Sequence, residues 1–298
     1  MLDIIIVNYN STGYLQQCIT SIYKAVNGHS INIFVQDNAS IDNVDRITDE
    51  FPQVRLCKNE ENLGFARAVN RAISEGTSPY VMLLNPDTCI REDFFQTVLD
   101  YMEENPKTGA LGPRILNHDG TIQGSARSFP TPFTAFFGRN SIMTRLFPGS
   151  RFSRKNILTD RTDGSKPIAT DWVSGACMLV RRETIEDVGA LDERFFMYWE
   201  DADWCRRMIM NGWRVVYFPM ASVVHYIGAS SNHALFRSTL EFHRSAYFLY
   251  CKHNKSMSWV ARPFAAFCLS VRFLLCVCVR SKHLITRRYC GPRSPYPA

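Results

Sequence analysis

The feature that most constrains the fold is the step from the apolar run Tyr80–Leu84 into Asn85-Pro86-Asp87. Such a short apolar run is typical of a strand that is buried on both faces of a sheet. Pro86 has no backbone N–H to give to a sheet ladder, so the strand is expected to end before it. Asp87 then lies at the carboxyl end of a parallel strand, the edge at which open α/β sheets bind ligands. A carboxylate there can hold a divalent cation that bridges to a diphosphate, although a strand end with a solvated Asp produces the same pattern.

Strand-like and helix-like segments alternate through the first third of the chain. Apolar runs predict strands at 2–7, 31–35, 54–58 and 80–84, and helical spacing predicts helices at 12–27, 42–50, 65–75 and 91–104. This alternation is typical of an α/β fold with a doubly wound, mostly parallel sheet flanked by helices. Further strands are expected at 110–116, 173–181, 215–218 and 222–225, and a helix at 201–211. Residues 125–170 have weak periodicity, which predicts a loop or a substrate lid.

Length and composition indicate a globular protein with reduced thiols. The 298 residues suffice for one large α/β domain or two small ones, and 46% are apolar. A strand pattern starts at Leu2 with no basic segment before it, so we expect no signal peptide and a cytosolic body. The ten cysteines include no Cys-x-x-Cys pair, which favours free thiols over disulfides or zinc.

The C-terminal part of the chain is strongly basic. From Phe242 onward there are ten Lys and Arg and no acidic residue, so residues 1–241 carry 24 basic and 28 acidic residues, a net charge of −4. Residues 263–279 are largely apolar, open with Pro263 as a helix start and contain Arg272. This run is shorter than the roughly 20 residues of a membrane span, and Arg272 would cost about 2.5–3.5 kcal/mol at a bilayer centre. A basic, apolar helix suits a membrane surface with anionic lipid; packing in an oligomer or a nucleic-acid patch is the alternative.

Two polar segments after strands are candidates for binding a nucleotide. Asp37 follows the second strand, where a carboxylate can accept a hydrogen bond from a base edge or a ribose hydroxyl, although a turn fits equally well. Gly64 opens a helix whose N-terminus favours anions, and Arg67 can contact a phosphate. A helix start with a solvated Arg fits the same residues. Neither the dinucleotide-binding glycine pattern nor a phosphate loop is present.

Two further groups are candidates for catalysis. Glu200 and Asp201 start a helix directly after the apolar run Phe195–Trp199, so partial burial would raise the pKa of a carboxylate toward that of a useful base. Acidic residues in a first helical turn are also ordinary capping residues. His225 ends an apolar run; near Asp87 it would complete a metal or diphosphate site, and elsewhere it would be structural.

In this order the segments resemble the family 2 inverting glycosyltransferases with the GT-A fold. The resemblance covers about residues 3–230. Within this family, the chain most resembles the bacterial rhamnosyltransferases that build cell-surface polysaccharide. It rests on the ordered set Val7-Asn8-Tyr9-Asn10, Asp37-Asn38-Ala39-Ser40, Asn62 to Asn70, Asn85-Pro86-Asp87, Ser174-Gly175-Ala176, Glu200-Asp201 and His225.

The resemblance implies a role for each of these residues. Asp201 would be the general base for a single inverting displacement, with Trp172, Gly175 and Glu200 on the acceptor side. Mg²⁺ or Mn²⁺ would bind Asp87 and His225; because Asn85 stands where the family's Asp-x-Asp motif begins, metal binding would rest on Asp87 and the diphosphate. The nucleotide-sugar pocket would comprise Asn8, Tyr9, Asn10, Asp37, Asn62, Gly64, Arg67, Asn85 and Asp87.

The resemblance also implies partners, location and domain organisation. The donor would be dTDP-L-rhamnose and the acceptor a polyprenyl-diphosphate-linked saccharide, at the cytoplasmic face of the inner membrane, with peripheral attachment and no nucleic acid. Residues 1–108 would bind the nucleotide sugar, 109–232 would bind the acceptor within the same domain, and 233–298 would form a basic, membrane-associating helical region.

Three alternatives are kept open. A UDP-hexose or another nucleotide sugar is a different donor within the same family. A nucleotidyltransferase would carry a Gly-rich, Arg-Lys signature after the first strand, which Val7-Asn8-Tyr9-Asn10 lacks. A membrane-docked scaffold without activity would be expected to have lost Asp87 or Asp201, and both are present.

Overall fold

The computed structural model describes residues 1–130, 158–159, 162–226, 235–254 and 258–289. The chain forms two compact units: Met1–Phe196 with Glu200–Asn232, and Met197–Trp199 with His233–Ala298. Much of the segment 125–170, predicted to be a loop or lid, lies outside the described residues. All nine cysteines in the described part of the chain are free.

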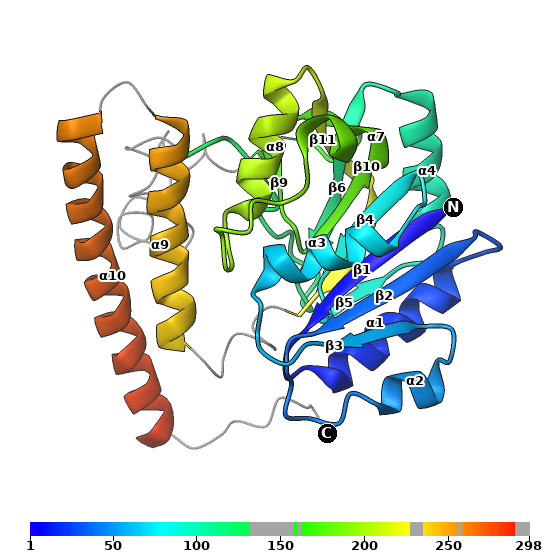
Figure 1. The fold of residues 1–298 in the computed structure, drawn as a ribbon, viewed down its shortest axis with the longest axis horizontal. Coiled ribbons are helices and arrows are strands. Elements are labelled where there is room, and N and C mark those ends of the chain that lie inside the picture. Colours follow the sequence, from blue (N-terminus) through cyan, green and yellow to red (C-terminus); the bar gives the residue numbers. More distant parts are fainter. Residues whose placement is uncertain (131–157, 160–161, 227–234, 255–257, 290–298) are drawn as a thin grey trace. The chain divides into compact units, whose positions relative to one another are not determined.

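The first unit alternates strands and helices as the sequence predicts (Figure 1). The ends shift by a few residues, because apolar periodicity locates the middle of an element better than its ends. Its elements are β1 (Leu2–Asn8), α1 (Thr12–Ala25), β2 (Ile31–Asp37), α2 (Arg46–Glu50), β3 (Arg55–Lys58), α3 (Phe65–Glu75), β4 (Tyr80–Leu84), β5 (Thr88–Ile90), α4 (Phe94–Glu104), β6 (Thr108–Leu116), β7 (Ala126–Arg127), β8 (Ile168–Ala169), β9 (Trp172–Val173), β10 (Cys177–Arg181), α7 (Arg182–Val188), α8 (Glu200–Met210) and β11 (Arg214–His225).

The central sheet has the strand order β3-β2-β1-β4-β10-β6-β11-β5, with β8 paired to β11. Strands β1 to β4 run parallel, and β6 runs parallel to β11. Strand β10 runs antiparallel between β4 and β6, while β5 and β8 run antiparallel to β11. The predicted fold class, a mostly parallel sheet flanked by helices, is confirmed.

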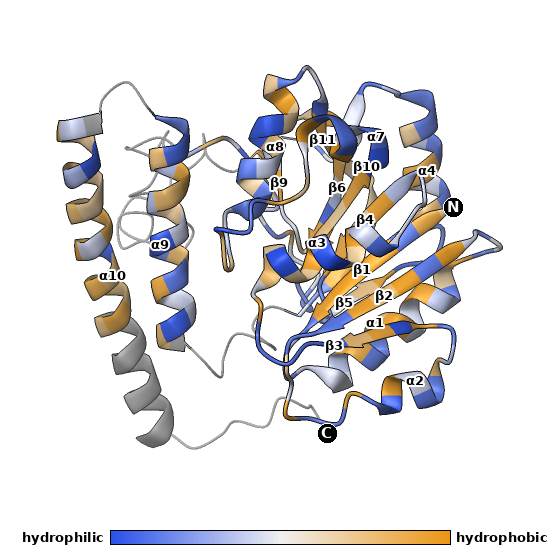
Figure 2. Ribbon diagram, in the orientation of Figure 1, coloured by the Kyte–Doolittle hydropathy of each residue, from blue (hydrophilic) through white to orange (hydrophobic). Residues whose placement is uncertain are grey.

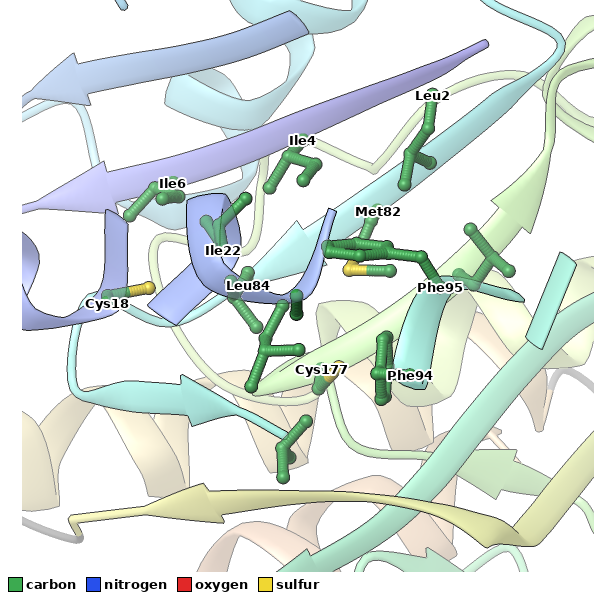
Figure 3. Close-up of a cluster of buried hydrophobic side chains, with 14 of the residues drawn as sticks. Leu2, Ile4, Ile6, Cys18, Ile22, Met82, Leu84, Phe94, Phe95 and Cys177 are labelled. Atoms are coloured by element: carbon green, nitrogen blue, oxygen red, sulfur yellow. The ribbon is translucent and has the colours of Figure 1, made fainter. Parts of the chain in front are cut away.

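The largest hydrophobic cluster lies between the sheet and the helices α1 and α4. Alternate residues of a strand point to the same face, so Leu2, Ile4 and Ile6 of β1 all enter this cluster (Figure 3). Phe94 and Phe95 of α4 meet them there, and Cys18 and Ile22 come from α1. Helix α3 packs against β1 and β2 outside this cluster, so both faces are covered (Figure 1). This double burial explains why the central strands are mostly apolar in Figure 2 and why all five residues of β4 are buried.

Two predicted boundaries were wrong, and helix α7 and the short strands β5, β7 and β8 were not predicted. The strand predicted at 173–181 is two strands, β9 and β10, separated by the turn 174–176, and β9 pairs with β7 in a separate small sheet. The strands predicted at 215–218 and 222–225 are one strand, β11, whose register shifts between Phe218 and Ser222. Strand β5 was missed because three residues are too few to show a period.

The second unit contains two helices that pack on each other, α9 (Leu235–His253) and α10 (Ser258–Tyr289). Pro263 lies inside α10, not at its start, because the helix already begins at Ser258. The 20 residues Trp259–Cys278 have a mean hydropathy of 1.7 and no buried residue, so by length and composition alone they could cross a membrane. The apolar run is therefore longer than the sequence analysis allowed.

Candidate active site

Polar side chains at the carboxyl ends of β1 and β2 bind one another. Asn8 is in register with Asp37, and Asn8 Nδ2 donates to Asp37 Oδ1 at 2.8 Å. The Ser40 N–H donates to Asp37 Oδ2 at 3.0 Å, and Ser40 Oγ accepts from the Asn10 N–H at 2.9 Å. Asp37 is only 2% exposed. Ser40 Oγ also donates to Asp37 Oδ1, which therefore has two donors, while Oδ2 keeps one lone pair for a ligand. These bonds fix the two strand-end loops.

Both loops carry residues with a left-handed backbone conformation. Asn10 has φ 51° and Ala39 has φ 58°. Asn tolerates this region better than other residues, whereas for Ala it costs about 1–2 kcal/mol. Such strain persists only where the surroundings impose it, and it gathers at binding sites. Tyr9, between buried Asn8 and strained Asn10, therefore lies in a tightly specified loop.

Gly64 makes a close backbone approach, but its partner is a protein segment. Its φ is +81°, and an added Cβ would lie 2.4 Å from the carbonyl oxygen of Phe196. The Phe65 N–H donates to that same oxygen at 2.7 Å. Asn62 Oδ1 accepts from the Gly64 N–H at 3.0 Å, and Asn38 Nδ2 donates to the Gly64 carbonyl at 3.0 Å. Gly64 thus joins the loop after β2 to the segment that leads into Asp201.

Arg67 lies on the surface of α3. Its Nε is 3.4 Å from Glu193 Oε2, and the two side chains are 55% and 48% exposed. An exposed pair of this kind contributes about 0–1 kcal/mol, so the guanidinium can exchange Glu193 for a phosphate at little cost.

The structure brings Asn85, Asp87 and His225 together. The turn 85–87 connects β4 to β5, and β11 ends at His225 in register with Thr88. His225 Nε2 lies 3.2 Å from Asp87 Oδ1 and 3.2 Å from Asn85 Nδ2. Residues far apart in the sequence therefore meet at the carboxyl edge of the sheet.

The Asp87–His225 pair fits a divalent cation. Gln123 Nε2 donates to the His225 carbonyl at 2.9 Å, which turns Gln123 Oε1 toward His225 Nδ1 at 3.1 Å. Nδ1 therefore carries the proton, and the Nε2 lone pair accepts from Asn85 Nδ2, a donor that a cation on Nε2 would displace. Asp87 is 5% exposed, and its Oδ1 makes no hydrogen bond to any described residue. Adjacent ligands of an octahedral Mg²⁺ lie about 3 Å apart, which matches the spacing of these two acceptors.

Two ligands do not complete a coordination shell. Within the described ranges, no three His, Cys, Asp or Glu side chains cluster as a metal site. Oxygens of a bound diphosphate and water would have to supply the remaining positions, as is usual for Mg²⁺. Sequence reasoning missed Gln123, since a glutamine in an aperiodic stretch gives no signal of its own.

Asp201 lies at the N-terminus of α8 and is oriented by backbone donors. Its Oδ2 accepts from the Gly175 N–H at 3.0 Å and its Oδ1 from the Ala202 N–H at 2.8 Å. Burial raises the pKa of Asp201, while these two N–H groups and the charge of Arg127 act against the rise. Burial and the neighbouring Asp201 raise the pKa of Glu200 well above its ordinary value. A carboxylate with a raised pKa is a stronger base near neutral pH.

Arg127 and Trp172 lie on the side of α8 that carries Asp201. The charge of Arg127 acts on Asp201, and α8 packs against β9, which contains Trp172. Trp172 is 8% exposed, and its Nε1 donates to the Ser128 carbonyl at 3.1 Å. The Arg127 guanidinium lies 5.5 Å from the centre of the Trp172 ring. Sequence reasoning placed Trp172 and Gly175 here but missed Arg127, because it occurs in the aperiodic segment after residue 124.

Known proteins resemble the chain in sequence and in fold. A model of the glycosyl transferase family 2 matches residues 3–189. An N-acetylglucosaminyl-diphospho-decaprenol L-rhamnosyltransferase of Mycobacterium tuberculosis is 30% identical over 267 residues, 85% of each chain. The dTDP-rhamnosyl transferase RfbF of Shigella flexneri is 24% identical over 233 residues, 76% of this chain and 69% of that one.

A solved structure confirms the fold. The mannosyltransferase PcManGT of Pyrobaculum calidifontis, in complex with GDP-Man and Mn²⁺, has a TM-score of 0.56 and 16% identity. The match covers 98% of this chain and 76% of that one.

The approach of Gly64 to Phe196 predicts a large effect of Gly64→Ala. A methyl group there meets the Phe196 carbonyl, so we expect the free energy of unfolding to fall by about 1–3 kcal/mol for the overlap. A further cost of about 1–3 kcal/mol is expected for the backbone conformation, φ 81° and ψ 179°, which essentially only glycine adopts. Urea denaturation followed by circular dichroism measures the sum.

Gly28→Ala is the matched control. Gly28 has the same φ of +81°, and a Cβ there would have no atom within 4 Å. It should therefore show only the cost of a positive φ. Equal destabilisation by the two variants would contradict the close approach at Gly64.

Proposed function

The chain belongs to glycosyl transferase family 2 and is a glycosyltransferase, and we propose that it transfers L-rhamnose from dTDP-rhamnose, with inversion, to a polyprenyl-diphosphate-linked saccharide in the synthesis of a bacterial surface polysaccharide. The observation that carries the proposal is that the oriented carboxylate of Asp201 and the Asp87–His225 pair lie at the same edge of the sheet; we assign the first as base and the second as cation ligands. The sugar and the lipid acceptor are supported by the names of the relatives from Mycobacterium tuberculosis and Shigella flexneri.

The donor would lie across the carboxyl ends of β1, β2 and β4. Asn8, Tyr9, Asn10 and Asp37 would line the nucleoside pocket, and Asn62 and Arg67 would lie toward the phosphates. Asp87 and His225, with Asn85 beside them, would face the diphosphate. A bound Mg²⁺ or Mn²⁺ would offset the charge that develops on the departing diphosphate; the structure of PcManGT carries Mn²⁺.

Asp201 would act on the acceptor. Its carboxylate takes the proton from an acceptor hydroxyl while that oxygen attacks the anomeric carbon of the sugar. The bond from this carbon to the diphosphate oxygen breaks as the new glycosidic bond forms, so dTDP leaves and the anomeric centre inverts. The Gly175 N–H donates to Asp201 Oδ2 and so orients the carboxylate. Trp172 and Glu200 would line the acceptor side of the site.

We further propose that α10 attaches the protein to the cytoplasmic face of the membrane. Val260, Phe264, Phe267, Val271 and Leu274 are each more than 40% exposed and recur every three or four residues, which places them on one helix face. Arg272 does not interrupt this face, because its guanidinium lies 5.4 Å from the centre of the Phe242 ring of α9. The ten basic residues after residue 241 would attract anionic lipid.

The proposed donor and acceptor can be tested by transfer of labelled rhamnose. We expect the full-length protein to transfer label from dTDP-rhamnose to polyprenyl-diphosphate N-acetylglucosamine when Mn²⁺ or Mg²⁺ is present. Transfer from a UDP- or GDP-sugar in the same assay, and none from dTDP-rhamnose, would contradict the proposed donor.

Asp201→Asn is the matched variant for this assay. The amide keeps the size of the side chain but cannot accept the proton, so turnover should fall by about 10²–10⁴ while dTDP binding persists. Because burial raises the pKa of Asp201, wild-type kcat/KM should already fall at a pH above about 3.9, the ordinary pKa of an aspartate. If kcat/KM falls only below about pH 3.9, or if the variant loses dTDP binding, the role of Asp201 as base is contradicted.

If Asp87 and His225 hold the cation, removal of either side chain should weaken metal-dependent binding of the donor nucleotide. Asp87→Ala and His225→Ala should each weaken Mn²⁺-dependent dTDP binding by about tenfold or more, as measured by calorimetry. Asp45→Ala, which removes a 60% exposed carboxylate, is the control and should change nothing. Equal dTDP affinity of wild type and variants, with and without chelator, would rule out this assignment.

The membrane proposal predicts lipid-dependent sedimentation. The protein should sediment with phosphatidylglycerol vesicles more than with phosphatidylcholine vesicles, and the double variant Phe264→Glu/Phe267→Glu should stay in the supernatant. Met210→Glu adds a single charge at a 73% exposed apolar residue of α8 and should still sediment. Unchanged binding by the double variant would refute the assigned face.

A further inference from the structure

The three residues directly before Glu200 and Asp201 belong to the helical unit of the chain. Met197–Trp199 group with residues 233–298, whereas Phe196 and Glu200 belong to the unit that contains the sheet. The chain therefore leaves one unit and returns to it within a single short loop, and Asp201 follows immediately on the return.

Helix α9 holds this loop through two residues one turn apart. Ser245 is 3% exposed, and its Oγ donates to the Met197 carbonyl at 2.9 Å. The Phe242 ring lies 5.7 Å from the ring of Tyr198 and 5.3 Å from that of Trp199. One side chain of α9 thus contacts both aromatic residues of the loop, in the tilted and edge-on geometries that aromatic pairs favour.

Phe242 is itself fixed within the helical pair. The guanidinium of Arg272 on α10 lies 5.4 Å from the centre of its ring, a cation–π contact. His243, next to Phe242, has its ring 5.7 Å from that of Phe273 on α10. The ring that holds the loop is therefore secured by α10 as well as by α9.

The loop needs such support because its backbone is strained. Tyr198 has φ 70° and Trp199 has φ 69°, a left-handed conformation that bulky residues seldom adopt, here at two consecutive positions. Strained conformations persist only where surrounding contacts impose them. On the other side of the loop, the Phe196 carbonyl accepts the Phe65 N–H and lies against Gly64. The residue before the loop is thus fixed within the sheet-containing unit, and the loop itself is fixed within the helical unit.

We infer that Phe242 and Ser245 are positioning residues for catalysis, which hold the strained loop Met197–Trp199 so that Asp201 meets the acceptor hydroxyl in the productive orientation. The inference rests on the proposed role of Asp201 as general base. It gives the helical unit a part in turnover as well as in membrane attachment.

Hydrogen exchange of the full-length protein tests the hold on the loop without any substrate. Phe242→Ala should speed amide exchange in residues 197–203, whereas Leu240→Ala, at a 43% exposed position of the same helix, should not. Ser245→Ala should have the same effect as Phe242→Ala. Its control is Ser270→Ala, which removes a hydroxyl that donates to Ala266 within α10. Unchanged exchange in both Phe242→Ala and Ser245→Ala would overturn the inference.

Kinetics separate positioning from folding. Phe242→Ala should lower kcat by about tenfold or more, because a small displacement of a reacting group is costly, with the KM for donor and the dTDP affinity unchanged. Phe242→Tyr keeps the ring and should restore kcat. Faster loop exchange with wild-type kcat would refute the positioning role. A wild-type protein that fails to transfer rhamnose would contradict the proposed donor alone, and the exchange result would then decide this inference.

Discussion

The arrangement of the site depends on one strand, β10, which runs antiparallel between β4 and β6. A parallel strand at this position would begin at the amino edge of the sheet, on the side opposite Asp37 and Asp87. Because β10 is reversed, its start and the preceding turn reach the carboxyl edge, and Gly175 there donates its N–H to Asp201. The buried ladder that β10 forms with β4 and β6 therefore joins the strand that leads to Asp87 to the turn that orients Asp201.

The sequence predicts the parallel half well because β1, β2 and β4 are buried on both faces and helices α1, α3 and α4 each bury an apolar side. The same reasoning locates Asn8, Asp37 and Asp87, since polar residues after consecutive parallel strands must share an edge. It fails where a contact depends on pairing that leaves no local pattern. Strand β5 is too short to have a period, and the contact of Gln123 with His225 depends on how β11 returns to the sheet.

Gly64 shows a subtler limit of sequence reasoning. A glycine at a helix start indicates that something approaches the backbone closely, and this much is correct. The approaching group is the Phe196 carbonyl, 132 positions further along the chain, and no local pattern specifies it. The positive φ values of Tyr198 and Trp199 are equally unpredictable, because aromatic residues favour an extended or helical backbone and only tertiary contacts oppose that preference.

The two adjacent carboxyl groups of α8 are distinguished by their hydrogen bonds. Asp201 accepts two backbone N–H bonds, which stabilise its ionised form. Glu200 is 6% exposed, and its Oε2 has no hydrogen-bond partner among the described residues, so ionisation of Glu200 is opposed both by burial and by the charge next to it. Burial raises the pKa of both carboxyl groups, and the Gly175 and Ala202 N–H groups act against the rise in Asp201. A raised pKa combined with an orientation fixed by two backbone donors is what the proposed base requires, and Asp201 has both.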